Sequence, residues 1–387
     1  MYKPTIGILT WREGTTFKEP EYFRQLLRAG RRLGAAVFLF SPGDVNVKSK
    51  KVKGIFLSSE DKWASRWFRW PDVVIDRYWY TQKPIFKEYV AFRKQPHFLY
   101  ANSRFANKWR AHEVLYNDEN MRKWLPETYL YTSQQRKLLE MLRRHQVIYL
   151  KPINGTGGRG ILRIDQQNGY YRMLGRDKNR NKKAAVARDA SSLTLRVKRW
   201  IGRDKYLLQQ GLDLGLLRDR SVDIRLLIQK DGSGEWKVTG MGVRVGPENS
   251  ATANLHGGGK AVEAKPFLAS HFGEEKADEI IRECHQLAHQ TASTVEGHFG
   301  RMMELGLDIG IDVIGRVWLI EINPKPGRDI FREMGQPDLY KLAVQRPLQF
   351  ALFLTSQQTP DGQWVWSGAE LQTKQRPAKQ MAKFRQY

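Results

Sequence analysis

The sequence predicts an α/β protein built from more than one domain. Its 387 residues and mass of 45.0 kDa leave room for two or three domains with cores of their own. Hydrophobic residues make up 41% of the chain, which is typical of a folded globular protein. Short apolar runs alternate with amphipathic stretches of helical composition, and this alternation is the usual pattern of an α/β domain.

A small N-terminal α/β domain is expected over residues 1–105. Residues 5–10 have the composition of a buried strand, residues 21–33 that of an amphipathic helix, and residues 36–40 that of the next strand. A basic aromatic patch in this domain has spacings of four and three, which favour the inward face of a helix over a base-stacking site: Trp63, Arg66, Trp67, Arg69 and Trp70.

The net positive charge of the chain favours anionic binding partners. The chain has 65 Lys and Arg against 40 Asp and Glu, a net charge of +25. Such a surface favours nucleic acid, anionic polymers or acidic peptides. No helix-turn-helix, RRM or zinc-finger pattern is present, so nucleic acid is the less favoured partner. The basic segment 172–205 is either a solvated face or a grip for an anionic substrate.

Cysteine usage and hydropathy point to a cytoplasmic protein. The single cysteine, Cys284, excludes an internal disulfide and a zinc knuckle, and we expect it to be a buried apolar side chain. The N-terminus lacks the layout of a signal peptide, and no apolar run is long enough for a membrane span. Residues 336–387 are expected to form a helix followed by a basic, loosely held tail.

The stretch Lys151–Ile161 is a candidate phosphate-binding loop. It places a lysine after the predicted strand 147–150 and before several glycines, whose backbone N–H groups can approach an anion closely. Residues 155–160 fit GxGxxG, but the apolar run 161–164 that follows has the composition of a strand and no suitably placed acid follows. The lysine precedes the glycines, which excludes a Walker A loop. Two interpretations remain, a hairpin over a nucleoside triphosphate and an ordinary glycine-rich hairpin.

An acidic hairpin near residue 310 is a candidate metal site. Residues 307–314 and 317–323 flank Gly315-Arg316, which favours a type II′ turn. That turn would place Asp308 opposite Asn323 and Gly310 opposite Glu321. Four side chains would then share one face, with Asp308 and Glu321 on a diagonal of roughly 7–8 Å: Asp308, Asp312, Glu321 and Asn323. Oxygen ligands alone select Mg²⁺, or Mn²⁺ as the alternative. The other interpretation is a hairpin with a solvent-facing polar side.

These motifs together resemble the ATP-grasp superfamily, in order from about residue 105 to residue 332. Lys108 and Lys151 match the two nucleotide lysines of that superfamily, and Leu207–Leu212 resembles its hinge strand. The resemblance implies ATP and Mg²⁺ as ligands, with the metal on Asp308, Glu321 and Asn323. The nucleotide-binding residues that it implies are Lys108, Lys151, Gly155, Gly157, Gly158, Gly160, Gln209, Gln210 and Leu212.

The resemblance also implies a domain plan. A pre-ATP-grasp domain over residues 1–105 would precede an ATP-grasp region over residues 106–335. Within that region, a glycine-hairpin lid subdomain would cover about 126–210 and a metal-binding subdomain about 211–335.

Further segments are similar in order to the ribosomal-protein glutamate ligases. Arg225 and Arg244 stand where those enzymes place two arginines near the transferred phosphoryl group, which implies a catalytic role for both. The weaker substrate-binding candidates are Asn254, His256, Gly257, Gly258, Lys325 and Arg328. His256 is either an acceptor contact or a plain loop residue. Lys325 and Arg328 either bind a carboxylate or keep their loop soluble.

A closer resemblance is carried by the stretches Gly7–Thr10, Lys151–Gly155, Gly158–Ile161 and Asn254–Gly259. Through them the chain resembles the YheC/YheD-like branch, which is associated with the endospore coat. Gln209 stands where many relatives carry a hinge glutamate, but its amide oxygen can still accept a hydrogen bond from adenine. The resemblance implies a Mg-ATP-dependent carboxylate–amine or carboxylate–thiol ligase that acts through an acyl phosphate, with an acidic peptide, an amino acid or a spore-coat protein as candidate acceptor. The alternative is a catalytically silent, ATP-binding coat protein. Because both lysines, both arginines and the metal set are intact, the active enzyme is favoured.

Overall fold

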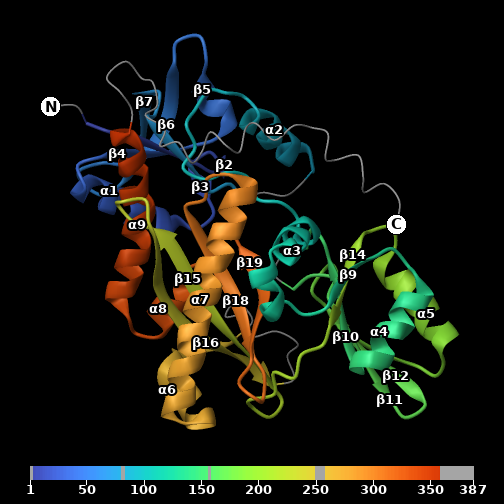
Figure 1. Cartoon of the computed structure of the whole chain (residues 1–387). Helices are drawn as coiled ribbons and strands as arrows, with labels where there is room; N and C mark the ends of the chain where they lie inside the picture. Colours follow the sequence, from blue (N-terminus) through green and yellow to red (C-terminus); the bar gives the residue numbers. More distant parts are fainter. Residues whose placement is uncertain (1–2, 80–82, 156–157, 249–257, 358–387) are drawn as a thin grey trace. The chain divides into compact units, whose positions relative to one another are not determined.

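The structure is a computed structural model that describes residues 3–79, 83–155, 158–248 and 258–357 (Figure 1). The chain forms two compact units. The first consists of Met1–Asn102, Lys230–Glu235 and Val344–Tyr387, and the second of Ser103–Gln229 and Trp236–Ala343. The candidate site residues that the structure describes all belong to the second unit.

The first unit is built on a sheet with the strand order β5-β6-β4-β1-β8, in which β7 also pairs with β6. The central strand β1 is parallel to both of its neighbours, and all five of its residues are buried, as expected for a strand covered on both faces. The strands are β1 (Thr5–Leu9), β4 (Ala36–Phe40), β5 (Val45–Asn46), β6 (Lys51–Leu57), β7 (Trp63–Arg69) and β8 (Val73–Asp76).

Helices and short elements complete this unit. The helix α1 has Pro20 in its first turn, where a missing N–H costs nothing, and buries an apolar stripe that includes Phe23, Leu26 and Leu27. The remaining elements are β2 (Arg12–Glu13), β3 (Thr16–Phe17), α1 (Pro20–Arg32), η1 (Pro42–Asp44) and α2 (Lys83–Arg93), and α9 (Pro337–Ser356) is the last helix described.

The expected tryptophan helix is wrong, because the segment forms strand β7. It pairs with β6 along its whole length, from Lys51↔Arg69 to Leu57↔Trp63. A spacing of four residues keeps two side chains on one face of a strand as well as of a helix, so the pattern could not discriminate. In the strand, Phe68 is the buried side chain, whereas Trp67 is 54% exposed.

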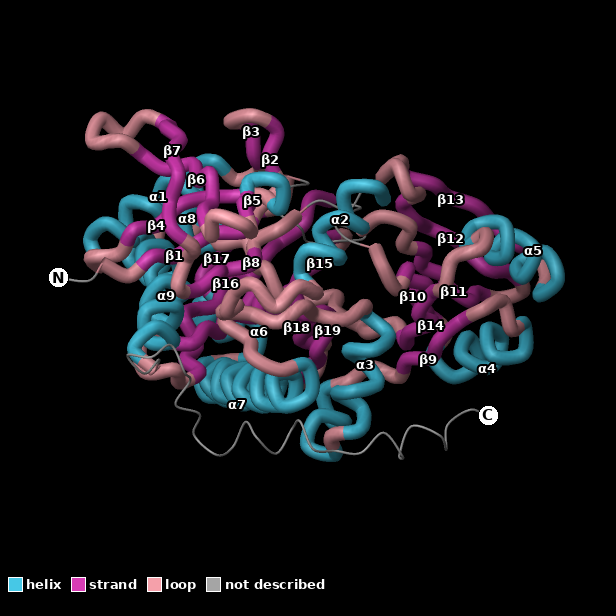
Figure 2. The backbone as a smooth tube through the Cα atoms, turned by 90° about the horizontal axis from the view of Figure 1, so that it is seen from above, coloured by secondary structure: helices cyan, strands magenta, loops and turns pink. Residues whose placement is uncertain are grey.

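In the second unit, one sheet has the order β13-β12-β11-β10-β14-β9, and all of its described pairings are antiparallel. The helices α4 and α5 lie on one face of this sheet (Figure 2). Leu138 and Leu193 of these helices belong to the same buried cluster as Ile148 and Leu208 of the strands. We call the opposite face the open face. The elements are β9 (Thr128–Tyr131), α4 (Gln135–His145), β10 (Val147–Pro152), β11 (Leu162–Gln167), β12 (Tyr170–Arg176), β13 (Lys182–Ala187), α5 (Ala190–Ile201) and β14 (Tyr206–Gln210).

The second unit also contains a sheet with the order β17-β16-β15-β18-β19. The long helix α7 buries a stripe against it that includes Cys284, which confirms the buried cysteine. Burial raises the pKa of that thiol well above its usual range. The elements are α3 (Lys108–Asn117), η2 (Glu119–Trp124), β15 (Arg220–Lys230), β16 (Trp236–Glu248), β17 (Lys260–Glu263), α6 (Ala264–Phe272), α7 (Glu274–Phe299), β18 (Glu304–Ile311), β19 (Val317–Asn323) and α8 (Asp329–Glu333).

The β18–β19 hairpin forms, but its predicted type II′ turn and register are wrong. The backbone N–H of Asp312 donates to the carbonyl of Arg316 (3.1 Å), and the N–H of Gly315 donates to the carbonyl of Asp312 (2.9 Å). The Asp312 carboxylate accepts from the N–H groups of Ile314 (3.1 Å) and Arg316 (2.9 Å), and Gly315 adopts φ +82°. The loop is therefore three residues long with glycine at the left-handed position, and the Asp312 side chain is committed to the turn rather than to the polar face.

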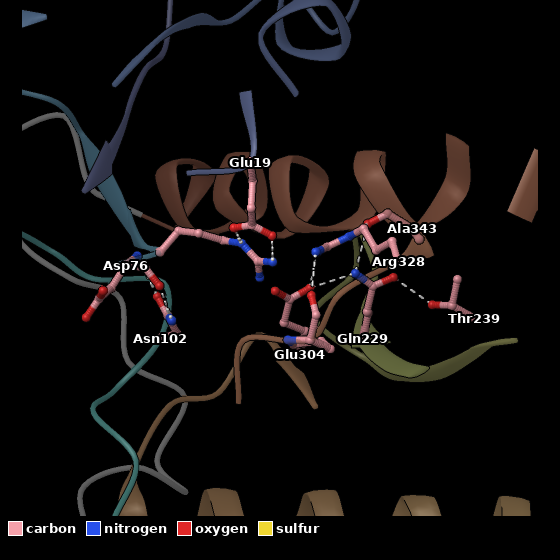
Figure 3. A network of polar contacts seen from close by, with 10 residues as sticks. Glu19, Asp76, Asn102, Gln229, Thr239, Glu304, Arg328 and Ala343 are labelled. Carbon is pink, nitrogen blue, oxygen red and sulfur yellow. Dashed lines mark hydrogen bonds and ion pairs between the residues drawn. The ribbon is translucent and has the colours of Figure 1, made fainter. Parts of the chain in front are cut away.

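A buried polar network fastens the loop after β19 to the β15–β19 sheet (Figure 3). Arg328 pairs with Glu304, and both side chains are only 2% exposed. The guanidinium also donates to the backbone carbonyls of Ala343 (2.9 Å) and Pro326 (3.0 Å). Gln229 donates to Glu304 (2.9 Å) and to the carbonyl of Ala343 (2.9 Å). Buried charges are tolerated when they are paired and hydrogen-bonded in this way.

The substitution Arg328→Ala should destabilise the second unit by about 3–5 kcal/mol, because it leaves the Glu304 carboxylate buried without its cation. Urea unfolding followed by circular dichroism measures the change. The matched control is Arg218→Ala, which removes an arginine side chain that is 96% exposed and should leave the unfolding curve unchanged. An Arg328→Ala curve equal to that of the wild type would contradict a structural role for the pair.

Candidate functional site

Two lysines that are far apart in the sequence lie near the same carboxylates. The Nζ of Lys108 is 3.1 Å from an oxygen of Glu321. The pKa of Lys151 is lowered to about 8, chiefly by burial and also by the nearby charge of Lys108, while the charges of Glu321 and Asp308 oppose this shift. Lys151 therefore interacts electrostatically with Lys108, Glu321 and Asp308. Strand β10, helix α3 and the β18–β19 hairpin thus contribute to one charged site.

Local structure fixes the position of Lys108. It is the first residue of α3, and Asn107 caps this helix by accepting a hydrogen bond from the N–H of Arg110 (3.0 Å). The backbone N–H of Lys108 donates to the carbonyl of Ile153 (3.1 Å), just beyond the end of β10. The start of α3 is therefore tied to the strand that carries Lys151.

Gln209 lies next to Lys151 with its amide oriented by its neighbours. The Nζ of Lys151 donates to the Gln209 Oε1 (2.5 Å), and the Gln209 Nε2 donates to the hydroxyl of Thr128 (2.9 Å). That hydroxyl in turn donates to the carbonyl of Pro126 (2.8 Å). Both ends of the Gln209 amide are therefore assigned, with its oxygen toward the lysine. Thr128 could not be recognised from the sequence, since an ordinary strand threonine carries no motif signal.

Gln210, by contrast, hydrogen-bonds to the backbone of Glu127, just before strand β9. Its side-chain oxygen accepts from the backbone N–H of Glu127 (3.1 Å), and its own backbone N–H donates to the Glu127 carbonyl (2.8 Å). Gln209 and Gln210 point to opposite faces, because successive strand residues alternate. Lys151 and Gln209 are on the open face, since their neighbours Leu150 and Leu208 lie in the core beneath α4 and α5.

The two candidate metal-binding carboxylates are directly opposed in the hairpin. The register pairs Asp308 with Glu321 and Gly306 with Asn323. It shifts between Asp308 and Ile309, so that Ile309 pairs with Leu319 and Ile320 is an extra residue on β19. The Asn323 amide lies 3.4 Å from Asp308. Asp308, Glu321 and Asn323 therefore share a face, as expected, although Glu321 rather than Asn323 is directly opposite Asp308.

Two arginines converge on Asp308. The Nε of Arg225 lies 2.6 Å from Asp308 Oδ1, and an Nη of Arg244 lies 3.1 Å from the same oxygen. Arg244 also donates twice to Asp223, at 2.6 and 2.8 Å. Burial alone would raise the pKa of Asp308, but the two guanidinium charges outweigh it and lower the pKa. Asp308 is thereby kept anionic with one oxygen occupied by cations.

The donor set suits a hard divalent cation. Asp308 and Glu321 supply carboxylate oxygens and Asn323 an amide oxygen, which are ligands that Mg²⁺ accepts. In the described part of the chain, no site gathers three or more His, Cys, Asp or Glu side chains, so further ligands would come from a bound substrate or water.

The remaining predicted residues fall into three groups. Gly157, Asn254, His256 and Gly257 lie outside the described residues. Gly158, Gly160 and Gly258 adopt positive φ, and a Cβ on Gly155 would lie 2.6 Å from the Pro152 ring, so these glycines shape their loops. Leu212 follows the end of β14, and Lys325 is half-buried in the loop after β19. Arg328 is buried in the network with Glu304, which contradicts the interpretation of it as an exposed loop residue and leaves its guanidinium no access to a substrate.

Comparison with known proteins supplies the family. The sequence profile of the YheC/D like ATP-grasp family matches residues 97–354. The chain is 26% identical over 380 residues to the endospore coat-associated protein YheD of Bacillus subtilis (strain 168), covering 94% of this chain and 81% of YheD. It is also 26% identical over 357 residues to YheC of the same organism, covering 89% of this chain and 95% of YheC.

Solved structures with the same fold include D-cycloserine synthetase DcsG, with a TM-score of 0.55 and 12% identity, over 91% of this chain and 99% of that one. Another is D-alanyl-alanine synthetase A from Vibrio cholerae O1 biovar eltor str. N16961, with a TM-score of 0.50 and 13% identity, over 92% and 98% of the two chains.

Within the described ranges, no helix has the length and apolar character that crossing a membrane requires.

The expected superfamily and branch are both confirmed, because the family match covers most of the chain. The chain therefore belongs to the YheC/D like ATP-grasp family and has a mixed α/β ATP-grasp fold with an N-terminal pre-ATP-grasp domain.

Proposed function

We propose that this protein is a Mg-ATP-dependent ligase that joins a carboxylate to an amine, or to a thiol, through an acyl phosphate. One observation carries the proposal. Lys108 and Lys151, from separate elements, lie in the field of Asp308 and Glu321, and the amide of Gln209 adjoins Lys151. Cations for a triphosphate, oxygens for a metal and an acceptor for adenine are thus combined in one site of an ATP-grasp protein.

Nucleotide binding would use the open face of the β9–β14 sheet. Lys151 and Lys108 would neutralise phosphate oxygens, while the glycine-rich loop after β10 would cover them. The Gln209 oxygen would accept from the adenine amino group, because Thr128 already holds the Gln209 NH₂. Lys108 now contacts Glu321, so nucleotide binding would exchange this ion pair for a lysine–phosphate contact and free Glu321 for a cation.

Asp308, Glu321 and Asn323 would hold Mg²⁺. When bound there, the cation neutralises charge that develops between the phosphate groups. Arg225 and Arg244 contact Oδ1 of Asp308, the oxygen that does not face Asn323, and keep this carboxylate ionised. Both guanidinium groups can also donate to the phosphoryl and acyl oxygens during transfer.

The reaction requires no covalent bond to the protein. The substrate carboxylate attacks the γ-phosphorus of ATP, which gives an acyl phosphate and ADP. The acceptor amine then attacks the acyl carbon and expels phosphate, and its proton leaves to solvent. Positioning and charge neutralisation account for the catalysis.

The second candidate function is a catalytically silent ATP-binding protein of the spore coat. It is favoured by the names of the relatives YheD and YheC, which describe association with the endospore coat and no reaction. The complete set of lysines, arginines and metal ligands favours the ligase. Association with the coat is compatible with both functions.

Glu321→Gln should reduce ADP formation by at least about 100-fold, because an amide is a poorer ligand for a hard cation than a carboxylate. Substrate-dependent ADP release measures the effect, and thermal unfolding monitors the fold. The control Glu279→Gln removes a carboxylate from an exposed pair with Lys276 on α7 and should keep full turnover. Full turnover of Glu321→Gln would show that the metal assignment is incorrect.

ATP affinity should fall as the pH rises through about 8. The free protein loses the Lys151 proton near that pH, whereas triphosphate binding favours the charged lysine, so affinity drops by up to about tenfold per pH unit above the pKa. Isothermal titration calorimetry between pH 7 and 9.5 measures this dependence. Gln209→Glu places a carboxylate beside Lys151, raises its pKa and should move the fall to higher pH.

Lys151→Ala is the reference for that titration. It should bind ATP more weakly at pH 7 and show a flatter pH profile, since the titrating group is absent. Wild-type and Lys151→Ala proteins with the same affinity and the same profile would remove Lys151 from the nucleotide site.

A screen for ADP release with Mg-ATP and pools of amino acids and acidic peptides tests the reaction itself. We expect at least one pool to raise ADP release above the ATP-only rate, and the Glu321→Gln protein to remove that increase. Silence across all pools in a protein that still binds ATP would favour the structural coat protein.

A further inference from the structure

The excess positive charge of the chain is concentrated around the β9–β14 sheet. Residues 126–210 contain 19 Lys and Arg against 6 Asp and Glu, a net charge of +13 out of +25 for the whole chain. Of these charged residues, the proposed nucleotide site uses only Lys151. The rest of the charge has no role in the chemistry proposed above.

Part of this charge lies on the open face, beyond the nucleotide site. Met173 of β12 and Ala187 of β13 belong to the core under α4 and α5, so the residues of opposite parity face the other way. These open-face residues are Arg172, Leu174, Arg176, Lys182, Ala184 and Val186. The register places Arg176 directly opposite Lys182, and two directly opposed like charges destabilise a sheet. An anionic ligand on this face would lie against both cations.

One acidic side chain, that of Asp165, lies beside the basic residues of the open face. Asp165 of β11 pairs with Arg172 in the register, but its carboxylate already accepts from Arg163 at 2.5 and 2.9 Å. Asp165 is therefore paired with Arg163 on its own strand. The open-face positions of β12 and β13 include three basic residues, Arg172, Arg176 and Lys182, and no acidic one.

The edge of the sheet beside these residues is open. β13 is the terminal strand of the order, and in the described residues no other strand pairs with its outer side. The N–H of Asp177 donates to the carbonyl of Asn181 (3.0 Å) at the hairpin end, which fixes the alternation of bonded pairs along β12 and β13. By this alternation, Lys182, Ala184 and Val186 direct their backbone N–H and C=O groups away from β12. The side chains of Ala184 and Val186 are small enough for another backbone to approach.

We propose that the outer edge of β13 and the basic open face beside it bind an extended acidic polypeptide, which adds to the sheet as a further strand. Backbone hydrogen bonds to Lys182, Ala184 and Val186 would supply affinity, and carboxylates at alternate positions would meet Arg176 and Lys182. This inference rests on the proposed ligase function, for which the polypeptide is the substrate chain.

The geometry sets a minimum length for this substrate. Adjacent strands lie about 4.8 Å apart, so a strand added to β13 runs about 19 Å from β10, the strand of Lys151. About six extended residues at roughly 3.3 Å each span that distance. A peptide with about five residues on the edge therefore needs about eleven residues in all to reach the phosphoryl site.

A polypeptide fits this surface better than a nucleic acid. The outward groups of β13 alternate N–H donors with C=O acceptors, and only another polypeptide backbone repeats that alternation. A phosphodiester backbone offers acceptors for the N–H groups but no donors for the carbonyls.

Fluorescence anisotropy of a labelled peptide of about twelve alternating Glu and Thr residues, with the full-length protein and no nucleotide, tests the surface. Wild-type protein should bind it, and the double variant Arg172→Glu/Lys182→Glu should weaken binding at least tenfold. The matched control Arg196→Glu/Arg199→Glu makes the same change of net charge on the exposed side of α5 and should weaken binding less than threefold. Equal losses in the two variants would overturn the site.

A backbone variant tests the added strand. Ala184→Pro removes an outward N–H without breaking a ladder bond to β12, a position at which edge strands tolerate proline. It should weaken peptide binding at least fivefold, whereas Ala184→Ser keeps the N–H and should bind as the wild type does. Unchanged binding by Ala184→Pro, with a native circular dichroism spectrum, would overturn strand addition.

Competition identifies the class of ligand. An oligothymidylate that carries the same number of negative charges should displace the peptide only at much higher concentration, and displacement at equal concentration would overturn the polypeptide proposal. ATP affinity, measured on the same variants, should stay at the wild-type value. A protein that binds the peptide but never forms ADP would contradict the ligase function alone, and a protein that forms ADP with other acceptors but does not bind the peptide would contradict this inference alone.

Discussion

The charged site of this protein depends on one carboxylate held between two guanidinium groups. Asp308 lies directly opposite Arg225 in the β15–β18 pair, and Arg244 reaches the same oxygen from β16. These cations keep Asp308 ionised despite its burial. They also orient its carboxylate, since both contact one oxygen and the second oxygen is directed toward Asn323. Three strands are thereby fixed at the point where the hairpin presents Glu321, and Glu321 in turn holds the lysine that begins α3.

The sequence was most informative where chemistry and periodicity agreed. The glycine loop, the candidate nucleotide lysines and the candidate metal-binding residues were predicted from residue type and order. The family comparison confirms the superfamily, and the roles of these residues stay predictions. The turn and register of the hairpin were not predictable, because Gly315-Arg316 suits a type II′ turn as well as the longer loop that the Asp312 side chain stabilises. The predicted helix through Trp67 failed because a spacing of four residues fits both periods. Thr128 and the role of Arg328 depend on tertiary contacts that leave no local pattern.

A neutral residue at position 209 distinguishes this site electrostatically. A glutamate there would pair with Lys151, whereas the amide only accepts a hydrogen bond from it. The lysine therefore lies buried beside a second lysine with less compensation, and its pKa falls to about 8. Triphosphate binding would then have to protonate Lys151, which lowers the binding free energy as the pH rises. A protein with glutamate at position 209 would keep this lysine charged, so its nucleotide affinity would not change with pH in the same range.

The extra residue at Ile320 decides which way Glu321 points. If the pairing between the turn and Leu319 continued without a bulge, Asp308 would face Ile320 and Glu321 would face Leu307, whose side chain lies in the core. A single deletion between Val317 and Ile320 would remove the bulge and still leave Glu321 opposite Asp308, whereas closing the bulge at the present length would turn the carboxylate inward while every motif remained legible in the sequence. The bulge at Ile320, which no motif records, is therefore as much a condition for the shared polar face as the two carboxylates themselves.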